Sequence, residues 1–418
     1  MGLIQCILDT VSASSQPPAT GTPPPRDPSP ARYAPGSAGY RRATLALFAA
    51  GMTTFMALYY VQALLPQLSE HFGSSPATSA LAVSLTTGFL AIAVIPASVA
   101  SERFGRVRVM VTSGVAASLI GILLPWAPSI EWLLAGRALQ GVLCAGVPAV
   151  AMAYLAEEVE GRSLGTVMGR YVAGTTIGGL TGRLIPGFAV DVVSWQWALE
   201  ITCLVSLGFA LVFAATAPAS RFFRPRPVSP SITARNLAAH LRDPRLLPLF
   251  ALAFLLMGGF VTAYNYLTYR LLGQPFHLSE AVVATIFLMY LAGTVSSAAS
   301  GRLADAIGRR RVLAASILMM GVGLAITVPD SLAAVLVGML LFTAGFFGAH
   351  SVASGGVSAT ATEHRAEASS LYLFHYYLGS SVAGVVGGLA FSAFGWVGVA
   401  AFVGALVLIS LVLALTRR

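Results

Sequence analysis

Lysine is absent from this 418-residue sequence, and charged residues of every kind make up only 10% of it. A soluble domain carries about 25% charged residues, because polar groups must cover its surface. Apolar and aromatic residues instead make up 56% of the chain, and the 42 glycines add a further tenth. These proportions exclude an ordinary soluble enzyme and indicate that lipid surrounds most of the chain.

The absence of lysine has a second consequence, for the source of energy. A nucleotide-binding loop of the form Gly-x-x-x-x-Gly-Lys-Ser/Thr cannot occur, so ATP bound by such a loop is excluded. All 25 basic residues are arginines, and the net charge is +9. Because these arginines are spread between apolar runs rather than gathered on one soluble face, we expect no nucleic-acid partner.

Cysteine is scarce as well. Cys6, Cys144 and Cys203 are far apart, and the last two lie inside apolar runs, so the sequence predicts neither a disulfide framework nor a metal site. The six histidines are equally dispersed, and no serine has a paired base. We therefore expect no metal, no cofactor and no catalytic residue, and an intramembrane enzyme is a less favoured alternative.

Long apolar runs dominate what remains. A helix needs about 20 mostly apolar residues to cross the hydrocarbon core of a bilayer. Twelve such runs are present, at 44–65, 77–100, 107–128, 131–155, 163–190, 195–217, 246–272, 279–303, 311–329, 331–354, 366–391 and 394–415.

The arginines predict the orientation of these spans, because short arginine-rich loops stay in the cytoplasm. Twenty-one of the 25 lie on one side, which places both termini of this multi-pass chain in the cytoplasm. Residues 11–40 contain eight prolines, so we expect 1–43 to be a disordered cytoplasmic tail. The polar stretch 218–245 is the predicted cytoplasmic linker between two bundles of six spans, 44–217 and 246–416.

The two halves are related by an internal repeat. Residues 98–106 align with 301–309 at an offset of 203, and residues 171–182 align with 376–387 at an offset of 205. Near-constant offsets indicate duplication of a six-span unit. The sequence therefore predicts an all-α integral membrane protein of twelve transmembrane helices in two pseudo-symmetric six-helix bundles.

Several of these segments carry the marks of a known family. The run from Gly301 to Arg311 resembles the cytoplasmic signature of the major facilitator superfamily, Gly-x-Leu-Ala-Asp-x-x-Gly-Arg-Arg, and residues 134–141 resemble the span-4 signature of its proton-coupled members. The segments 345–354 and 370–381 resemble the YnfM-like, arabinose-efflux-like branch, near the twelve-span drug:proton antiporters. The first-half copy of the loop signature departs from the pattern, with Ser98 and Glu102 in place of glycine and aspartate.

This resemblance implies the major facilitator fold and a secondary transporter working by alternating access in the bacterial inner membrane. It favours proton-coupled efflux of small amphipathic compounds or drugs, by a chain that acts as a monomer in the lipid bilayer. Uptake or facilitated diffusion of a small metabolite or sugar is the alternative. A transporter-like sensor without flux is a further one, and a flux assay separates it from a carrier.

The loop signature has a mechanical interpretation. Its carboxylates and arginines can latch one conformation at the cytoplasmic face and release it in the other. The competing interpretation is that these charges only set topology. The predicted gating residues are Glu102, Arg103, Gly105, Arg106, Gly301, Asp305, Gly308, Arg309 and Arg310.

Arg137 is the most informative single residue, because it lies inside span 4 and its counterpart in the repeat is Met339. A charge within the membrane usually faces a cavity or a partner. The resemblance implies a role in proton coupling or in sensing substrate charge. Snorkelling toward the external surface is the alternative.

Other polar residues within the spans are candidates for the cavity or for carrying protons. In the implied fold, spans 1, 4, 7 and 10 line the cavity, and we favour Gln62 and Asn265 over Tyr60 and Tyr264, because tyrosines also form interfacial belts. His375, which aligns with Arg170, and Glu200 are candidate proton carriers, along with Glu131.

Two features of span 5 have structural interpretations. Gly174, Gly178 and Gly182 repeat every fourth residue, so they lie on one helix face and predict close packing against another helix. Arg183, which replaces Gly388 of the second copy, is expected to form an ion pair with Asp191 or Glu200.

Overall fold

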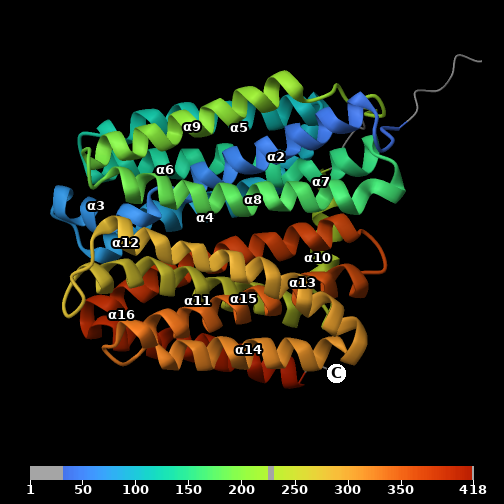
Figure 1. Cartoon of the computed structure of the whole chain (residues 1–418). Helices are drawn as coiled ribbons and strands as arrows, with labels where there is room; N and C mark the ends of the chain where they lie inside the picture. The colour runs from blue at the N-terminus through green and yellow to red at the C-terminus, as the bar shows by residue number, and fades with distance from the viewer. Residues whose placement is uncertain (1–31, 225–229, 417–418) are drawn as a thin grey trace, which may run out of the picture. The chain divides into compact units, whose positions relative to one another are not determined.

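The computed structural model describes residues 32–224 and 230–416. Within these ranges the chain is helical, with one isolated backbone bridge between Tyr33 and Val159. Figure 1 shows the first six spans, blue to green, grouped together, and the last six, yellow to red, grouped together.

The first set begins where Ser37 caps a helix by accepting a hydrogen bond from the Tyr40 backbone N–H at 3.2 Å. Its spans are α2 (Ala38–Tyr59) continued by η1 (Gln62–Leu64) and α3 (Leu65–Phe72), α4 (Pro76–Phe104), α5 (Arg106–Leu123) with η2 (Leu124–Trp126), α6 (Ile130–Cys144) with α7 (Gly146–Glu158), α8 (Gly161–Ala189) and α9 (Trp195–Thr216).

The second set repeats this order. Its spans are α11 (Leu247–Leu272), α12 (Glu280–Thr285) with η3 (Ile286–Met289) and α13 (Tyr290–Ile307), α14 (Arg309–Ile326), α15 (Leu332–Thr360) and the long α16 (Arg365–Thr416). Gly395 interrupts α16 with a φ of 57°, so this element supplies the last two spans.

Nine segments of the described ranges are long and apolar enough to cross a membrane. This number is three below the twelve predicted spans, and the sequence explains the difference. α8 is rich in glycine and contains Arg183, α14 starts with three consecutive arginines, and α16 is counted once despite its kink. The predicted all-α fold is confirmed.

One predicted boundary needs correction, and the predicted linker contains an additional helix. Residues 38–43 belong to α2 rather than to a disordered tail, because Ser37 supplies the helix cap; residues 1–31 lie outside the described ranges. The linker 218–245 contains a helix, α10 (Pro230–His240). Asn236 and His240 contact His364 at the start of α16, at 3.3 and 3.2 Å. Near the C-terminal end of the linker, the hydrogen bond that the Arg245 side chain donates to Asp243 lowers the pKa of the Asp243 carboxyl.

The glycine stripe of α8 packs against α2. A Cβ built on Gly178 would lie 2.6 Å from both the Cα and the carbonyl oxygen of Met52, and Gly174 and Gly182 meet Phe48 and Met56 in the same way. The corresponding helices of the second set, α11 and α16, approach through Gly379 against Phe254. Close backbone packing of this kind is typical of small residues at four-residue spacing.

This geometry predicts the effect of one added methyl group. Gly178→Ala should lower the free energy of unfolding by about 1–3 kcal/mol, because the backbone of Met52 cannot move aside cheaply. Gly169→Ala is the matched control on the same helix, since nothing lies within 4 Å of its built Cβ. We expect the control to be neutral or stabilising by about 0.5–1 kcal/mol. Thermal unfolding in detergent measures both, and equal effects would contradict the packing interpretation.

Candidate functional site

The first span is interrupted where two buried arginines meet it. α2 ends at Tyr59, and a single 3-10 turn at Gln62–Leu64 precedes α3. The last carbonyls of a helix have no partner within it, and in lipid water cannot supply one. Interrupted helices of this kind often form ion and substrate sites in transporters.

Arg137 satisfies the exposed end of α2. Its Nη1 and Nη2 donate to the carbonyls of Ala57 and Leu58 at 2.9 and 2.7 Å, and its Nε donates to the carbonyl of Ala82 at 2.7 Å. Nη1 also donates to the side chain of Gln140. A cation at a helix C-terminus is favoured by the helix dipole. Every nitrogen of this fully buried guanidinium is therefore used within the first bundle.

Arg183 lies on the other side of the same interruption. Its Nε donates to Gln62 Oε1 at 2.7 Å, and Nη1 donates to the carbonyl of Gly179. The rings of Tyr59, Phe287 and Tyr290 surround its Cζ at 4.2, 5.1 and 4.9 Å. Tyr59 belongs to the first bundle, whereas the other two rings belong to the second.

The expected ion pair of Arg183 with Asp191 or Glu200 is wrong. Arg183 points inward and is only 2% exposed, and none of the ion pairs recorded among residues 32–224 and 230–416 involves it. Glu200 instead accepts a hydrogen bond from Trp126 Nε1 at 2.8 Å.

A hydrogen bond between two amides joins the bundles beside Arg183. Gln62 Nε2 donates to Asn265 Oδ1 at 2.6 Å, and both side chains are fully buried. The bond joins the turn after α2 in the first bundle to α11 in the second. Among the described residues, neither Asn265 Nδ2 nor the nearby Ser84 hydroxyl has a hydrogen-bond partner. Arg183, Gln62 and Asn265 thus form one polar chain across the bundle interface.

Further contacts close the bundles toward the ends of α3 and α11. The Tyr269 hydroxyl donates to the carbonyl of Leu65 at 2.9 Å and lies 2.7 Å from the Ser69 hydroxyl. Where α4 crosses α16, a Cβ built on Gly388 would lie 2.7 Å from Ala77. These contacts lie on the side away from the arginine-rich loops.

The remaining predicted cavity residues are distributed around this cluster. Tyr60 is buried with Arg137 4.9 Å from its ring. The Tyr264 hydroxyl pairs with Thr343 at 2.7 Å, and its ring lies 5.4 Å from Phe287. Tyr60 therefore contacts Arg137 directly, and Tyr264 is linked to Arg183 through the ring of Phe287.

The three candidate proton carriers make no recorded contact with this cluster in the described ranges. They are His375, Glu200 and Glu131. His375 hydrogen-bonds through Nδ1 to the Leu371 carbonyl at 2.7 Å and stacks on Phe250. Glu131 pairs with Ser129 at 2.5 Å.

The loop signatures of the two halves differ in the contacts that their charged residues make. Arg106, only 5% exposed, donates to Glu102 at 2.6 Å, to Glu157 at 2.8 Å and to Ser101 at 2.7 Å. Arg103 lies beside the ring of Phe104. Gly105 and Gly308 each join two helices with a φ near +97°, which favours glycine.

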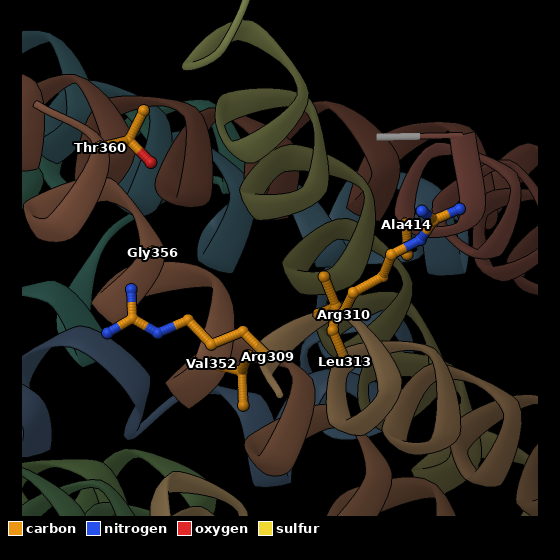
Figure 2. A pocket seen from close by; sticks show the side chains of 7 residues that line it. All are labelled: Arg309, Arg310, Leu313, Val352, Gly356, Thr360 and Ala414. Carbon is orange, nitrogen blue, oxygen red and sulfur yellow. The ribbon is translucent and has the colours of Figure 1, made fainter. Parts of the chain in front are cut away.

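In the second half, Asp305 is exposed, and no hydrogen bond or ion pair is recorded for it in the described ranges. Figure 2 shows Arg309 and Arg310 extending in opposite directions, and Arg310 donates to the carbonyl of Leu415. Gly301 has no neighbour within 4 Å of its built Cβ. The cavity here has a volume of about 240 Å³ and is lined by Arg309, Arg310, Leu313, Val352, Gly356, Thr360 and Ala414.

Sequence reasoning missed two buried arginines. Arg183 was assigned to a peripheral ion pair, although its replacement of Gly388 was the signal that duplication alone does not explain it. Arg270 donates to the carbonyls of Val328 and Pro329 at 3.1 and 3.0 Å, beyond the end of α14. Its position within an apolar run was the only available signal.

Comparison with known proteins gives a consistent result. The family model described as Major Facilitator Superfamily matches residues 47–299 and 267–418. The chain is 43% identical over 376 residues to the inner membrane transport protein YnfM of Escherichia coli, covering 90% of each chain. It is 40% identical over 376 residues to the MFS-type transporter YybF of Bacillus subtilis, covering 90% of this chain and 93% of that protein.

Solved structures share the fold at low sequence identity. The nucleoside transporter NupG matches with a TM-score of 0.75 at 14% identity, over 90% of this chain and 99% of its own. A bacterial homologue of the human lysosomal transporter Spinster matches with a TM-score of 0.72 at 16% identity, over 92% and 96% of the two chains.

The contacts of Arg137 predict that its loss destabilises the fold. Arg137→Met should lower the free energy of unfolding by about 3 kcal/mol or more, because buried carbonyls of α2 and α4 lose charged donors. Arg302→Met, at an exposed position of α13, is the matched control and should leave stability unchanged. Thermal unfolding in detergent compares them. An Arg137→Met variant as stable as the control would show that the recorded contacts do not support the end of α2.

Proposed function

The chain belongs to the Major Facilitator Superfamily, and from this premise we propose that it moves small amphipathic compounds out of the cell by alternating access, coupled to protons. Its relatives are membrane transporters rather than enzymes, and they include a protein of a bacterial inner membrane. Membership in this family supports a multi-pass transporter of the inner membrane. Our proposal adds the direction of transport, the coupling ion and the class of substrate.

The hydrogen bond between Gln62 and Asn265 is the observation that carries the mechanism. Each amide comes from a different bundle, and both side chains are fully buried. When the two bundles rock about a central site, contacts between them break at one end of the transporter and form at the other end. This hydrogen bond must therefore break during the cycle. A buried amide pair suits this task, because each amide can exchange its partner for water or substrate.

The conformation supports one half of that cycle. The bonds between bundles lie at Gln62 and Asn265 and between Tyr269 and the start of α3, away from the loops that carry Arg106 and Arg309. If those arginine-rich loops face the cytoplasm, as the positive-inside rule favours, the closed end is the external one. The conformation is then inward-facing.

The chemistry of the cluster supports an amphipathic substrate. Aromatic rings and amides share one buried site, so an apolar body and a polar group can both be satisfied there. The resemblance of residues 134–141 to the span-4 signature of proton-coupled members favours protons as the coupling ion. Of the candidate carriers, His375 lies within a span and uses only Nδ1 in a recorded bond, which leaves Nε2 for a proton.

Flux in proteoliposomes with an imposed proton gradient tests the coupling. We expect gradient-driven movement of at least one compound from a panel of amphipathic drugs, metabolites and sugars. His375→Gln should slow movement driven by the gradient while exchange of substrate without a gradient continues. Flux that ignores the gradient would instead favour a facilitator, and the absence of all flux would favour a sensor.

A cross-link between the bundles tests alternating access directly. A Cβ built on Gly384 lies 4.0 Å from the Cβ of Ser84, close to the typical disulfide value of about 3.8 Å. In a chain without its native cysteines, Ser84→Cys with Gly384→Cys should lose flux on oxidation and regain it on reduction. The bond prevents α4 and α16 from separating.

The matched control joins two helices of one bundle. A Cβ built on Gly114 of α5 also lies 4.0 Å from the Cβ of Ala210 on α9. Gly114→Cys with Ala210→Cys should keep its flux after oxidation. Equal flux of the oxidised interbundle pair and its reduced form, with the disulfide verified by mass spectrometry, would contradict rocking at this interface.

A further inference from the structure

Arg183 carries a buried positive charge for which residues 32–224 and 230–416 supply no ion-pair partner. A charge of this kind is costly inside a membrane protein and usually marks a functional site. We propose that Arg183 binds the charged head of the transported compound, which is a monovalent organic anion, a carboxylate or sulfonate, on an aromatic or apolar body. This inference rests on the proposed transport function and names its substrate class.

The comparison with Arg137 separates a structural arginine from a binding one. Arg137 uses all three nitrogens on carbonyl and amide oxygens of its own bundle. Arg183 uses Nε and Nη1, and no acceptor for its Nη2 is recorded in the described ranges. A guanidinium offers donors in a planar fork that fits a carboxylate. Arg183 therefore retains donors for a ligand, whereas Arg137 does not.

Neutral donors without partners lie beside this guanidinium. The Tyr290 hydroxyl is buried with no hydrogen-bond partner in the described part of the chain, and its ring lies 4.9 Å from the Cζ of Arg183. Asn265 Nδ2 also has no partner among the described residues, and two hydrogen bonds through Gln62 link this side chain to Arg183. Unpaired buried donors cost free energy, and an anionic group with several lone pairs can satisfy them.

The charge count favours a single negative charge on the ligand. Arg183 is the cation of the cluster that keeps a donor for a ligand, because Arg137 directs all its nitrogens to oxygens of its own bundle. A dianion such as a phosphate monoester would leave one charge uncompensated in a low-dielectric site. A neutral ligand would leave the charge of Arg183 without a negative counter-charge.

An aromatic wall extends from Arg183 into the second bundle. Tyr290 contacts Phe260 at 5.4 Å, and Phe260 stacks on Phe346 at 3.9 Å between centroids. The wall continues to His350, which is half-buried, at 5.9 Å from Phe346. Flat rings of this kind suit an aromatic or apolar ligand body.

The duplication gives the ligand an orientation. Arg183 has Gly388 as its counterpart, so the second bundle holds no equivalent cation. The aromatic wall lies in the second bundle. The charged end of the ligand therefore faces the first bundle, and its apolar body faces the second.

Ligand charge is the first test, and it needs no variant. Wild-type protein in phosphatidylcholine nanodiscs is titrated calorimetrically with naphthalenesulfonate, neutral naphthalenesulfonamide and cationic naphthylmethyl-trimethylammonium. We expect the anion to bind at least about tenfold more tightly than the neutral probe, because its hydrogen bonds to Arg183 are charge-assisted. Equal affinities, or a preference for the cation, would overturn the assignment.

Variants then test the residue. Arg183→Gln should weaken naphthalenesulfonate binding about tenfold or more and leave naphthalenesulfonamide binding unchanged, while Arg183→Lys should retain part of the anion affinity. Arg170→Gln removes the same charge from an exposed position of α8 and should bind like wild type. Equal weakening of both probes by Arg183→Gln would make Arg183 a support of the bundle interface and would overturn anion recognition.

Flux of the same probes distinguishes this inference from the proposed function. Naphthalenesulfonate that binds but does not cross proteoliposomes would contradict transport of this substrate class and so the assignment of the anion as cargo. Flux of the neutral or cationic probe without binding or flux of the anion would leave transport standing and overturn the anion site. Saturable flux of naphthalenesulfonate that Arg183→Gln removes supports both.

Discussion

A backbone that is interrupted inside lipid must find partners for its carbonyls, and this constraint organises the whole site. α2 ends at Tyr59, and Arg137 reaches from α6 to bond the carbonyls of Ala57 and Leu58. The interruption turns consecutive residues toward different partners, so that Tyr60 lies beside Arg137 and Tyr59 beside Arg183. Gln62 follows in the same turn and reaches the second bundle. One capped helix end thus positions the cluster between the bundles.

Symmetry and its loss divide structural from specific roles. Glycines pack α8 on α2 as they pack α16 on α11, and Gln62 and Asn265, one from each half, bond to each other. The arginines break the symmetry, because Met339 and Gly388 stand at the positions that correspond to Arg137 and Arg183. Duplication explains how two bundles can close on each other. The residues that occur in only one half of the repeat are those that give the site its charge and its orientation.

The fold followed from the sequence because its cause is local. Apolar runs of membrane length and a repeat offset near 203 were sufficient for twelve spans in two bundles. The preference for Gln62 and Asn265 relied on chemistry alone, and the structure does bring these amides together. The role of Arg183 could not be derived, since a span's rotation about its axis decides whether a side chain meets Asp191 or a partner bundle. That rotation depends on packing at Gly174 and Gly178, which the sequence indicates only as a stripe.

The seam between α4 and α16 has a kinetic consequence. Small residues meet there: Gly88 lies against Ser381, Ser84 against Gly384 and Ala77 against Gly388. Such surfaces approach closely but carry no large knobs that must leave deep holes before the helices part. In the proposed alternating-access cycle, separation of these two helices would meet little steric resistance, so the hydrogen bonds and the ring contacts of Arg183 would dominate the barrier to each reorientation. Turnover speed would then be adjustable at single residues, without reshaping either bundle.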